Sequence, residues 1–245
     1  MAEHSNKRIA LVTGANKGIG YETARRLASQ GMTVLLGARD EPRGKEAAAK
    51  LQAEGLDVQF LRLDVTDQTT HKAAHGFIED KFGKLDVLVN NAGIALDIGQ
   101  KPSEVDMQTL RKTFDTNFFG AVAVTQAFLP LIRKSDAGRI VNVSSGLASL
   151  TLHNDPTWAG YPLKLLAYNT SKTALNAFTV TLAYELKDTT IKVNSAEPGY
   201  TATDLNGHSG HKTVEQAADV IIQLATLPAD GATGGYFDDQ GVLPW

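Results

Sequence analysis

Directly after the apolar run at residues 9–12 comes the stretch Thr13-Gly14-Ala15-Asn16-Lys17-Gly18-Ile19-Gly20. Three glycines between a strand and a helix permit a tight turn and let a phosphate approach the backbone closely. The free N–H groups and the partial positive charge at the helix N-terminus then favour an anion. The spacing Gly-x-x-x-Gly-x-Gly is neither the usual dinucleotide fingerprint nor a Walker A loop, and a glycine-rich turn can be purely structural. Its position after the first strand nevertheless favours nucleotide binding.

Short apolar runs alternate with helical patterns along the whole chain. Short runs rich in apolar residues predict strands at residues 9–12, 33–36, 58–63, 87–89, 139–143, 191–195 and 235–237. Helical periodicity predicts helices at residues 18–30, 43–54, 67–82, 107–134, 165–186 and 214–227. Buried strands separated by helices predict an α/β fold, a doubly wound Rossmann-type parallel sheet of about seven strands with helices on both faces. No repeat or linker interrupts the pattern, so residues 1–245 are predicted to form one domain.

Composition excludes several classes of function. The net charge of −3 gives no reason to expect nucleic acid or an anionic membrane as a partner. The absence of cysteine excludes disulfides, thiolate nucleophiles and cysteine-ligated metals. Residues 1–8 lack the apolar core of a signal peptide, and no apolar run is long enough to span a bilayer. These features predict a cytoplasmic protein.

The end of the second predicted strand bears on the choice of cofactor. In a doubly wound fold an acid at this place binds the ribose 2′-hydroxyl of NAD, whereas an arginine accommodates the 2′-phosphate of NADP. Arg39 occupies this place, Lys17 in the glycine loop adds a second cation, and Asp40 lies one position later. The alternative is that Arg39 and Lys17 are ordinary solvated charges.

Polar side chains follow other predicted strands at the edge of the sheet where ligands bind. They are the turn Asn90-Asn91-Ala92-Gly93, the pair Ser144-Ser145 and the segment Glu197-Pro198-Gly199-Tyr200-Thr201-Ala202-Thr203. Each is also a common turn sequence. Asn117 lies within the apolar face of a predicted helix, where an amide without partners costs about 1–3 kcal/mol. It therefore either bridges backbone groups or holds water at a site.

Tyr168 and Lys172 lie four positions apart near the start of a predicted helix. Such residues lie one turn apart on the same helix face, so the ammonium is expected near the phenol. A nearby positive charge lowers the pKa of a phenol, and a tyrosine tuned in this way exchanges protons in catalysis. A surface lysine beside a half-buried tyrosine is the structural alternative.

Together these motifs resemble the short-chain dehydrogenase/reductase family, in its compact single-domain branch. Residues 13–20 match its Thr-Gly-x-x-x-Gly-x-Gly motif, residues 90–93 its Asn-Asn-Ala-Gly motif, and residues 198–199 its Pro-Gly turn. Within the family the chain looks most like the NADPH-dependent carbonyl reductases. This closer resemblance rests on Asn16-Lys17-Gly18, Ala38-Arg39-Asp40, Asn117-Phe118-Phe119-Gly120 and Trp245.

The resemblance implies a catalytic tetrad of Asn117, Ser145, Tyr168 and Lys172. Tyr168 would protonate the carbonyl oxygen of the substrate, and Ser145 would donate a hydrogen bond to that oxygen. Lys172 would hold the nicotinamide ribose and lower the pKa of Tyr168, while Asn117 would support a water chain that resupplies the proton.

The resemblance also implies the contacts to NADP(H), and it implies no metal. Asp64 and Val65 would contact the adenine, and Thr201 and Thr203 the nicotinamide amide and the phosphates. The full implied set is Gly14, Asn16, Lys17, Gly18, Ile19, Gly20, Arg39, Asp64, Val65, Asn91, Ala92, Gly93, Tyr168, Lys172, Pro198, Gly199, Thr201 and Thr203.

Two features stand apart from the family pattern or compete with it. The segment between Ser145 and Tyr168 is longer than in most of the family, so it either walls the substrate pocket or disturbs the helix-on-helix dimer contact of relatives. His71 and His75 have metal-like i, i+4 spacing but no visible third ligand, so a solvated helix face is the expectation for both.

The sequence therefore predicts reversible, NADPH-dependent reduction of a ketone or aldehyde to an alcohol, with the proton from Tyr168. One alternative is an NAD-linked alcohol dehydrogenase of the same family, against which Arg39 and Lys17 argue. Another is a non-catalytic NADP-binding redox sensor, which would be expected to lack Tyr168 or Lys172. The expected assembly is a homodimer or homotetramer, with a monomer as the alternative.

Overall fold

The computed structural model describes residues 7–245, so residues 1–6 of the polar N-terminal segment lie outside the described residues. Seven parallel strands form one sheet in the order β3-β2-β1-β4-β5-β6-β7. The strands are β1 (Ile9–Thr13), β2 (Thr33–Ala38), β3 (Val58–Arg62), β4 (Val87–Asn90), β5 (Arg139–Val143), β6 (Lys192–Ala196) and β7 (Tyr236–Phe237). The predicted doubly wound Rossmann-type sheet is confirmed.

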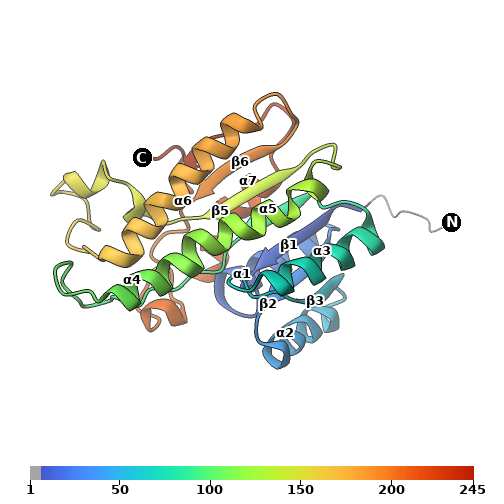
Figure 1. Cartoon of the computed structure of the whole chain (residues 1–245), viewed down its shortest axis with the longest axis horizontal. Helices are drawn as coiled ribbons and strands as arrows, with labels where there is room; N and C mark the ends of the chain where they lie inside the picture. The colour runs from blue at the N-terminus through green and yellow to red at the C-terminus, as the bar shows by residue number, and fades with distance from the viewer. Residues whose placement is uncertain (1–6) are drawn as a thin grey trace.

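Helices cover both faces of this sheet (Figure 1). They are α1 (Gly18–Ser29), α2 (Glu41–Ala53), α3 (Gln68–Phe82), α4 (Met107–Phe114), α5 (Ala121–Ile132), α6 (Leu166–Glu185) and α7 (Val214–Ala225). One apolar core joins the sheet to α1, α2 and α7, and a second joins the opposite face to α3, α5 and α6. No helix within residues 7–245 is long and apolar enough to cross a membrane.

The strand order reverses between β1 and β4, which are direct neighbours through Leu11 and Leu88. The chain leaves β1 towards α1 and β2 on one side, and leaves β4 towards β5 on the other. The loops after these two strands therefore separate and open a crevice at their carboxyl ends, where doubly wound folds bind ligands.

The predicted continuous helix over residues 107–134 is wrong in its middle. A π-helical turn, η1 (Asp115–Gly120), separates α4 from α5 and contains the buried Asn117. A π-turn adds a residue to the helical circuit and often occurs at functional sites. The apolar pattern of Phe114 and Phe118 fits an ordinary helix equally well, so this turn could not be predicted from it.

Candidate active site

A cleft of about 700 Å³ opens at the carboxyl ends of the central strands. Most of the expected cofactor contacts line it, together with part of the loop after β4 and part of the loop after β6. The expected contacts that line the cleft are Gly14, Asn16, Lys17, Gly18, Ile19, Gly20, Arg39, Asp64, Val65, Asn91, Ala92, Gly93, Tyr168, Lys172, Pro198 and Thr203.

Four expected site residues are absent from the lining of this cleft: Asn117, Ser145, Gly199 and Thr201. The Thr201 hydroxyl is buried and donates to the Gly199 carbonyl at 3.0 Å. Gly199 faces the side chain of Lys212, because a Cβ on Gly199 would lie 2.5 Å from Lys212 Cδ. The Pro-Gly turn thus presents Pro198 to the cleft and uses Gly199 and Thr201 to hold its own shape.

The glycine loop leaves the start of α1 open to a ligand. Gly14 and Gly18 have φ angles of 62° and 59°, which favour glycine. A Cβ on Gly20 would lie 2.4 Å from Asn91 Nδ2, so only glycine fits between α1 and the β4 turn. The N-cap residue Lys17 provides no side-chain acceptor, which leaves the first N–H groups of α1 available to an anion. This loop fits the pyrophosphate of a dinucleotide.

Asn90, at the end of β4, and Asn91, directly after it, bind neighbouring strands through their amides. Asn91 Nδ2 donates to the Thr13 carbonyl at 2.8 Å, which ties the β4 turn to the glycine loop. Asn90 Nδ2 donates to Asn142 Oδ1 at 2.9 Å, which ties β4 to β5. These bonds hold the floor of the cleft.

Arg39 lines the cleft just after β2, and the neighbouring acid is already engaged. Asp40 caps α2 by accepting from the Arg43 N–H at 3.0 Å, and its other oxygen accepts from the Arg43 guanidinium at 2.8 Å. The hydrogen bonds from the Arg43 side chain and backbone hold the pKa of Asp40 below its usual value. Within residues 7–245 Asp40 is paired with Arg43 and Arg39 forms no ion pair, so the arginine is available to an anion here.

The turn after β3 is fixed by side chains that lie below the cleft. Thr70 Oγ1 accepts from the Asp64 N–H at 3.1 Å, and His71 Nε2 lies 2.8 Å from the Asp64 carbonyl. His71 is buried, so the expected solvated position of His71 is wrong. The burial of His71 could not be predicted from the hydrophobic pattern, because a histidine that bonds a backbone carbonyl can occupy the core face of α3. His71 holds Asp64 in place and has no metal partner in its helix.

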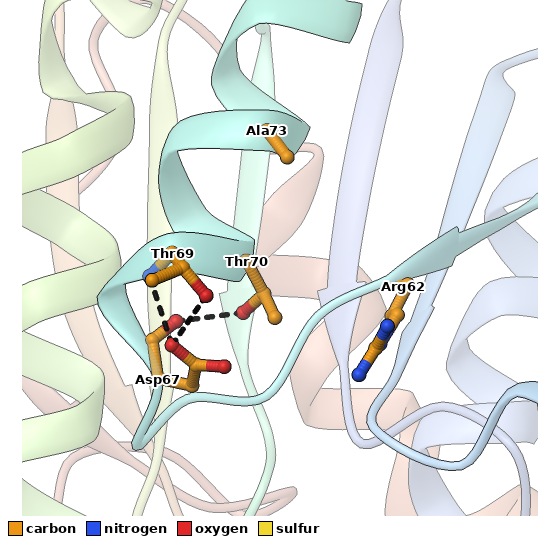
Figure 2. A pocket seen from close by; sticks show the side chains of 5 residues that line it. All are labelled: Arg62, Asp67, Thr69, Thr70 and Ala73. Atoms are coloured by element: carbon orange, nitrogen blue, oxygen red, sulfur yellow. Dashed lines mark hydrogen bonds between the residues drawn. The ribbon is translucent and has the colours of Figure 1, made fainter.

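In a smaller hollow beside this turn, Asp67, Thr69 and Thr70 are already hydrogen-bonded to one another (Figure 2). The Asp67 carboxylate accepts from both the N–H and the hydroxyl of Thr69, at 2.9 and 2.7 Å, and so caps α3. Thr70 donates to the Asp67 carbonyl at 2.7 Å. Figure 2 shows Arg62 apart from these groups on the strand side of the hollow. The polar groups around this hollow therefore serve to cap the start of α3.

Tyr168 and Lys172 line the cleft, and Ser145 lies beside Tyr168. The Ser145 side chain interacts with the Tyr168 phenol in the direction that lowers its pKa, and the Ser145 hydroxyl accepts from the Leu147 N–H at 3.3 Å. Ser144 also lines the cleft, and its Oγ is buried without a hydrogen-bond partner among the described residues. Lys172 Nζ donates to the Val143 carbonyl at 2.7 Å and lies 5.9 Å from the centre of the Tyr168 ring. Contact with Tyr168 favours Ser145 over Ser144 as the hydroxyl partner.

The direction of the Tyr168 pKa differs from the expectation. Burial raises the pKa of Tyr168 to about 12, against a smaller lowering by the Ser145 hydrogen bond and with a further rise from the Glu197 carboxylate. Burial lowers the pKa of Lys172 to about 8. The predicted lowering by Lys172 is therefore wrong, because removal of the phenol from water outweighs an ammonium that is turned towards Val143.

Asn117 acts as a bridge to the β4 turn. Its Oδ1 accepts from the Ile94 N–H and its Nδ2 donates to the Ile94 carbonyl, both at 2.8 Å. Nδ2 also donates to Ser171 Oγ at 3.0 Å, which links the π-turn to α6. Gly93 fits between Asn117 and Lys172, since its missing Cβ would lie 3.4 Å from Lys172 Nζ and 3.5 Å from Asn117 Oδ1.

Asp97 is a site residue that the sequence analysis missed. It is fully buried, and its carboxylate accepts from the N–H groups of Ala167 at 2.6 Å and Tyr168 at 3.3 Å. It caps α6 from a distant loop, because the N-cap residue Leu165 has no side-chain acceptor. A helix start without Ser, Thr, Asp or Asn was the one signal that a remote cap was needed.

Charged side chains join the glycine loop on one side of the cleft to the segment after β6 on the other. Lys17 Nζ lies 2.5 Å from Asp204 Oδ2, and His208 Nε2 lies 2.8 Å from Asp204 Oδ1. Both partners of Asp204 lower its pKa, Lys17 most. His208 has a φ angle of 61°, which is uncommon for a residue with a side chain. The segment after the Pro-Gly turn therefore contacts the glycine loop directly.

The long segment between Ser145 and α6 packs on the turn at Gly146. Of the described residues, none from 149–165 lines the cleft of about 700 Å³. Trp158 instead packs against Gly146, whose added Cβ would lie 3.2 Å from Trp158 Cζ2. His153 meets the Trp158 ring edge-on at 5.3 Å, and burial lowers the pKa of His153.

Known proteins share both the sequence and the fold. Residues 8–213 match the short chain dehydrogenase family. The chain is 35% identical to short-chain dehydrogenase/reductase 1 of Saponaria officinalis over the full length of both, and 35% identical to carbonyl reductase (NADPH) 1 of Mus musculus over 98% of this chain and 99% of that relative.

Two solved structures superpose closely. Salutaridine reductase from Papaver somniferum gives a TM-score of 0.81 with 32% identity, over 95% of this chain and 100% of that one. NADPH-bound carbonyl reductase from chicken fatty liver gives 0.85 with 26% identity, over 98% and 100%. The family match and the full-length identity show that this chain belongs to the short-chain dehydrogenase family of oxidoreductases.

Proposed function

We propose that the protein reduces a ketone or aldehyde to an alcohol with NADPH, and that the reaction is reversible. The observation that carries this proposal is that Tyr168 and Lys172 lie together in the lining of a cleft that fits a dinucleotide, with Ser145 beside Tyr168. Bound NADPH would supply the hydride.

The proton chemistry follows from the two pKa directions. With its pKa raised to about 12, the Tyr168 phenol keeps its proton at neutral pH and can donate it to a carbonyl oxygen. The Ser145 hydroxyl provides a hydrogen bond to the same oxygen. With its pKa lowered to about 8, Lys172 is mostly an ammonium at neutral pH and can hold ribose hydroxyls. Asn117 keeps the β4 turn, and with it Ile94, in register with these groups.

Selection of NADPH would rest on Arg39 and Lys17. Both line the cleft, and Asp40, the acid that could have favoured NAD, is bound to Arg43. Two similar proteins are named for NADPH, the mouse carbonyl reductase and the chicken structure. The 2′-phosphate is the group that Arg39 and Lys17 would contact.

The substrate class is an apolar, medium-sized carbonyl compound. Ile94, Ala95 and Leu96 line one side of the cleft, and Leu205 lines the other. Leu96 and Leu205 are exposed by 43% and 40% of their surfaces, so their apolar side chains are available to a ligand.

A panel of aromatic and aliphatic ketones, aldehydes and diketones tests the proposal, with NADPH oxidation followed by absorbance. Wild type is run beside Tyr168→Phe, and beside Tyr184→Phe as a matched change on the exposed side of α6. Turnover that collapses in Tyr168→Phe alone is the expected result. Equal or better use of NADH at the same concentration would refute the choice of cofactor. Tight binding of NADPH without turnover on any carbonyl would favour a redox sensor.

A further inference from the structure

One peptide group beside the catalytic cluster is held at both edges by side chains. The Tyr236 hydroxyl donates a short hydrogen bond to the Ser145 carbonyl. Glu197 Oε1 accepts from the Gly146 N–H at 3.0 Å. The Ser145 carbonyl and the Gly146 N–H belong to the same planar peptide bond, so these two contacts fix the orientation of its plane. We call this pair of contacts the Ser145 clamp.

Both side chains of the clamp are themselves immobilised. Tyr236 is buried, and its ring stacks on Trp245 with centroids 5.4 Å apart and planes at 18°. The Trp245 carbonyl accepts from the Thr151 N–H at 3.1 Å, which anchors the C-terminus beside the long segment, as Figure 1 shows. Glu197 directly follows β6, and its N–H donates to the Phe237 carbonyl of β7 at 2.7 Å. The clamp therefore rests on two paired strands and on the end of the chain.

The space around the clamped peptide is filled. A Cβ on Gly146 would lie 3.2 Å from Trp158 Cζ2 and 3.3 Å from Glu197 Oε1, closer than most real contacts. Trp158 thus covers the same peptide that Glu197 and Tyr236 hold. The peptide cannot rotate without displacing an indole, a carboxylate or a stacked phenol.

Rotation of this peptide would move the Ser145 backbone and, with it, the hydroxyl that contacts Tyr168. We propose that Glu197 and Tyr236 are positioning residues for the carbonyl reduction, holding the Ser145–Gly146 peptide so that the Ser145 hydroxyl stays against Tyr168. This inference rests on the proposed function. Neither residue belongs to the catalytic tetrad, and neither is among the residues that line the cleft.

The charge of Glu197 gives the clamp a second effect on the site. Its carboxylate raises the pKa of Tyr168, in addition to the larger rise from burial. Burial raises the pKa of Glu197 itself, while the N–H groups of Gly146 and Gly199 and the Lys212 ammonium oppose that rise. A carboxylate at this place therefore keeps the phenol protonated as well as keeping its partner serine in place.

A double-mutant cycle tests the positioning role. Tyr236→Phe keeps the ring and its stacking on Trp245, and Glu197→Ala removes the other edge of the clamp. Each should lower kcat by about tenfold and change KM for NADPH by less than about twofold. Glu197→Gln, which retains an acceptor oxygen, should regain most of the loss. In a Ser145→Ala background the same changes should cost less than about twofold, because they act through Ser145. If the clamp variants lower kcat about tenfold in the Ser145→Ala background as well, the proposal is overturned.

Hydrogen exchange separates failure of the clamp from failure of the proposed function. Exchange of the Gly146 amide in the full chain should accelerate by at least about tenfold in Glu197→Ala and stay near wild type in Glu197→Gln. Tyr184→Phe, on the exposed side of α6, serves as the control. Unchanged exchange in Glu197→Ala would refute the clamp even in an active reductase. Accelerated exchange in a protein that reduces no carbonyl would support the clamp and refute only the reaction.

Discussion

Helices α1 and α6 both begin at the cleft, and their first turns are completed in opposite ways. At α1 the N-cap Lys17 supplies no acceptor, so the first N–H groups face the cleft without a carboxylate. At α6 the buried Asp97 carboxylate accepts from Ala167 and Tyr168. Both helix starts carry the same partial positive charge. One is left open for the phosphates of a ligand, and the other is closed to fix the side chain that we propose as the acid.

The carboxylate near each helix start, Asp97 at α6 and Asp204 at α1, also differs in burial and in what it binds. Asp97 is fully buried and contacts the backbone of α6 directly. Asp204 is exposed and reaches the start of α1 only through the Lys17 ammonium. A buried hydrogen-bonded carboxylate is a permanent part of the fold, whereas an exposed ion pair exchanges partners at little cost. The comparison therefore separates a fixed helix start from a replaceable one.

Removal of the fixed cap should have the largest effect. In Asp97→Ala the N–H groups of Ala167 and Tyr168 lose their acceptor in a buried place, so the free energy of unfolding should fall by about 3 kcal/mol. The reductase kcat should fall at least about tenfold, because Tyr168 lies in the turn that loosens. Urea denaturation and NADPH oxidation measure the two effects.

Asp106→Ala is the matched control for this prediction. Asp106 caps α4 in the same manner, by accepting from Gln108 and Thr109, but it is exposed and these bonds hold the start of α4, not that of α6. Asp106→Ala should lower the free energy of unfolding only slightly and leave kcat unchanged. If both variants lose activity equally, the cap of α6 has no special role.

Giving α1 the cap that it lacks should have the next largest effect. Lys17→Asp places a carboxylate acceptor at the N-cap, where it satisfies the N–H groups that a phosphate would otherwise bind. The Kd for NADPH should rise about thirtyfold, which corresponds to about 2 kcal/mol. Lys17→Ala removes only the cation and should raise the Kd by about fivefold. Calorimetric titration compares the two, and equal losses would show that the open helix start contributes nothing.

The sheet and the glycine loop could be predicted because their signals are local. Short apolar runs mark the central strands, and the spacing of Gly14, Gly18 and Gly20 marks the turn that they require. The Asp97 cap could not be predicted, since its carboxylate binds backbone 70 positions away along the chain. The Glu197 contact with Gly146 spans 51 positions and was missed for the same reason.

The direction of the Tyr168 pKa shift also could not be predicted from the sequence. Helical spacing correctly brings Lys172 near Tyr168, but it does not report how deeply the phenol is buried. Burial decides the sign of the Tyr168 pKa shift, and burial depends on strands and loops from the whole chain. The solvated position expected for His71 failed similarly, because its partner is the backbone carbonyl of Asp64.

The closed helix start also predicts a pH dependence. The pKa of Lys172, one turn beyond Tyr168 in α6, is lowered to about 8, so its ammonium is present below that pH and is lost as the pH rises through it. Tyr168 remains protonated over this range. The kcat for reduction should therefore be level below about pH 7, fall to about half of that plateau at about pH 8, and lie about tenfold below the plateau at about pH 9. In Lys172→Arg this decline should disappear, although the absolute rate is lower. A level wild-type profile to about pH 10 would contradict the assignment.

The replaceable contact at α1 should have the smallest effect. In the protein Asp204 holds the Lys17 ammonium that we propose for the 2′-phosphate, so the two anions compete for one cation. Asp204→Asn should therefore lower the Kd for NADPH by about twofold to fivefold at low salt, and the gain should fade at high salt because both partners are exposed. NADH, which lacks the 2′-phosphate, should gain less.

Asp219→Asn is the control for this prediction. It removes an exposed ion pair to Arg26, farther along α1, and should change the affinity for neither NADPH nor NADH. Weaker NADPH binding in Asp204→Asn would mean that the bridge across the cleft helps to retain the cofactor, and the start of α1 would then be closed by its ligand in the way that α6 is closed by Asp97.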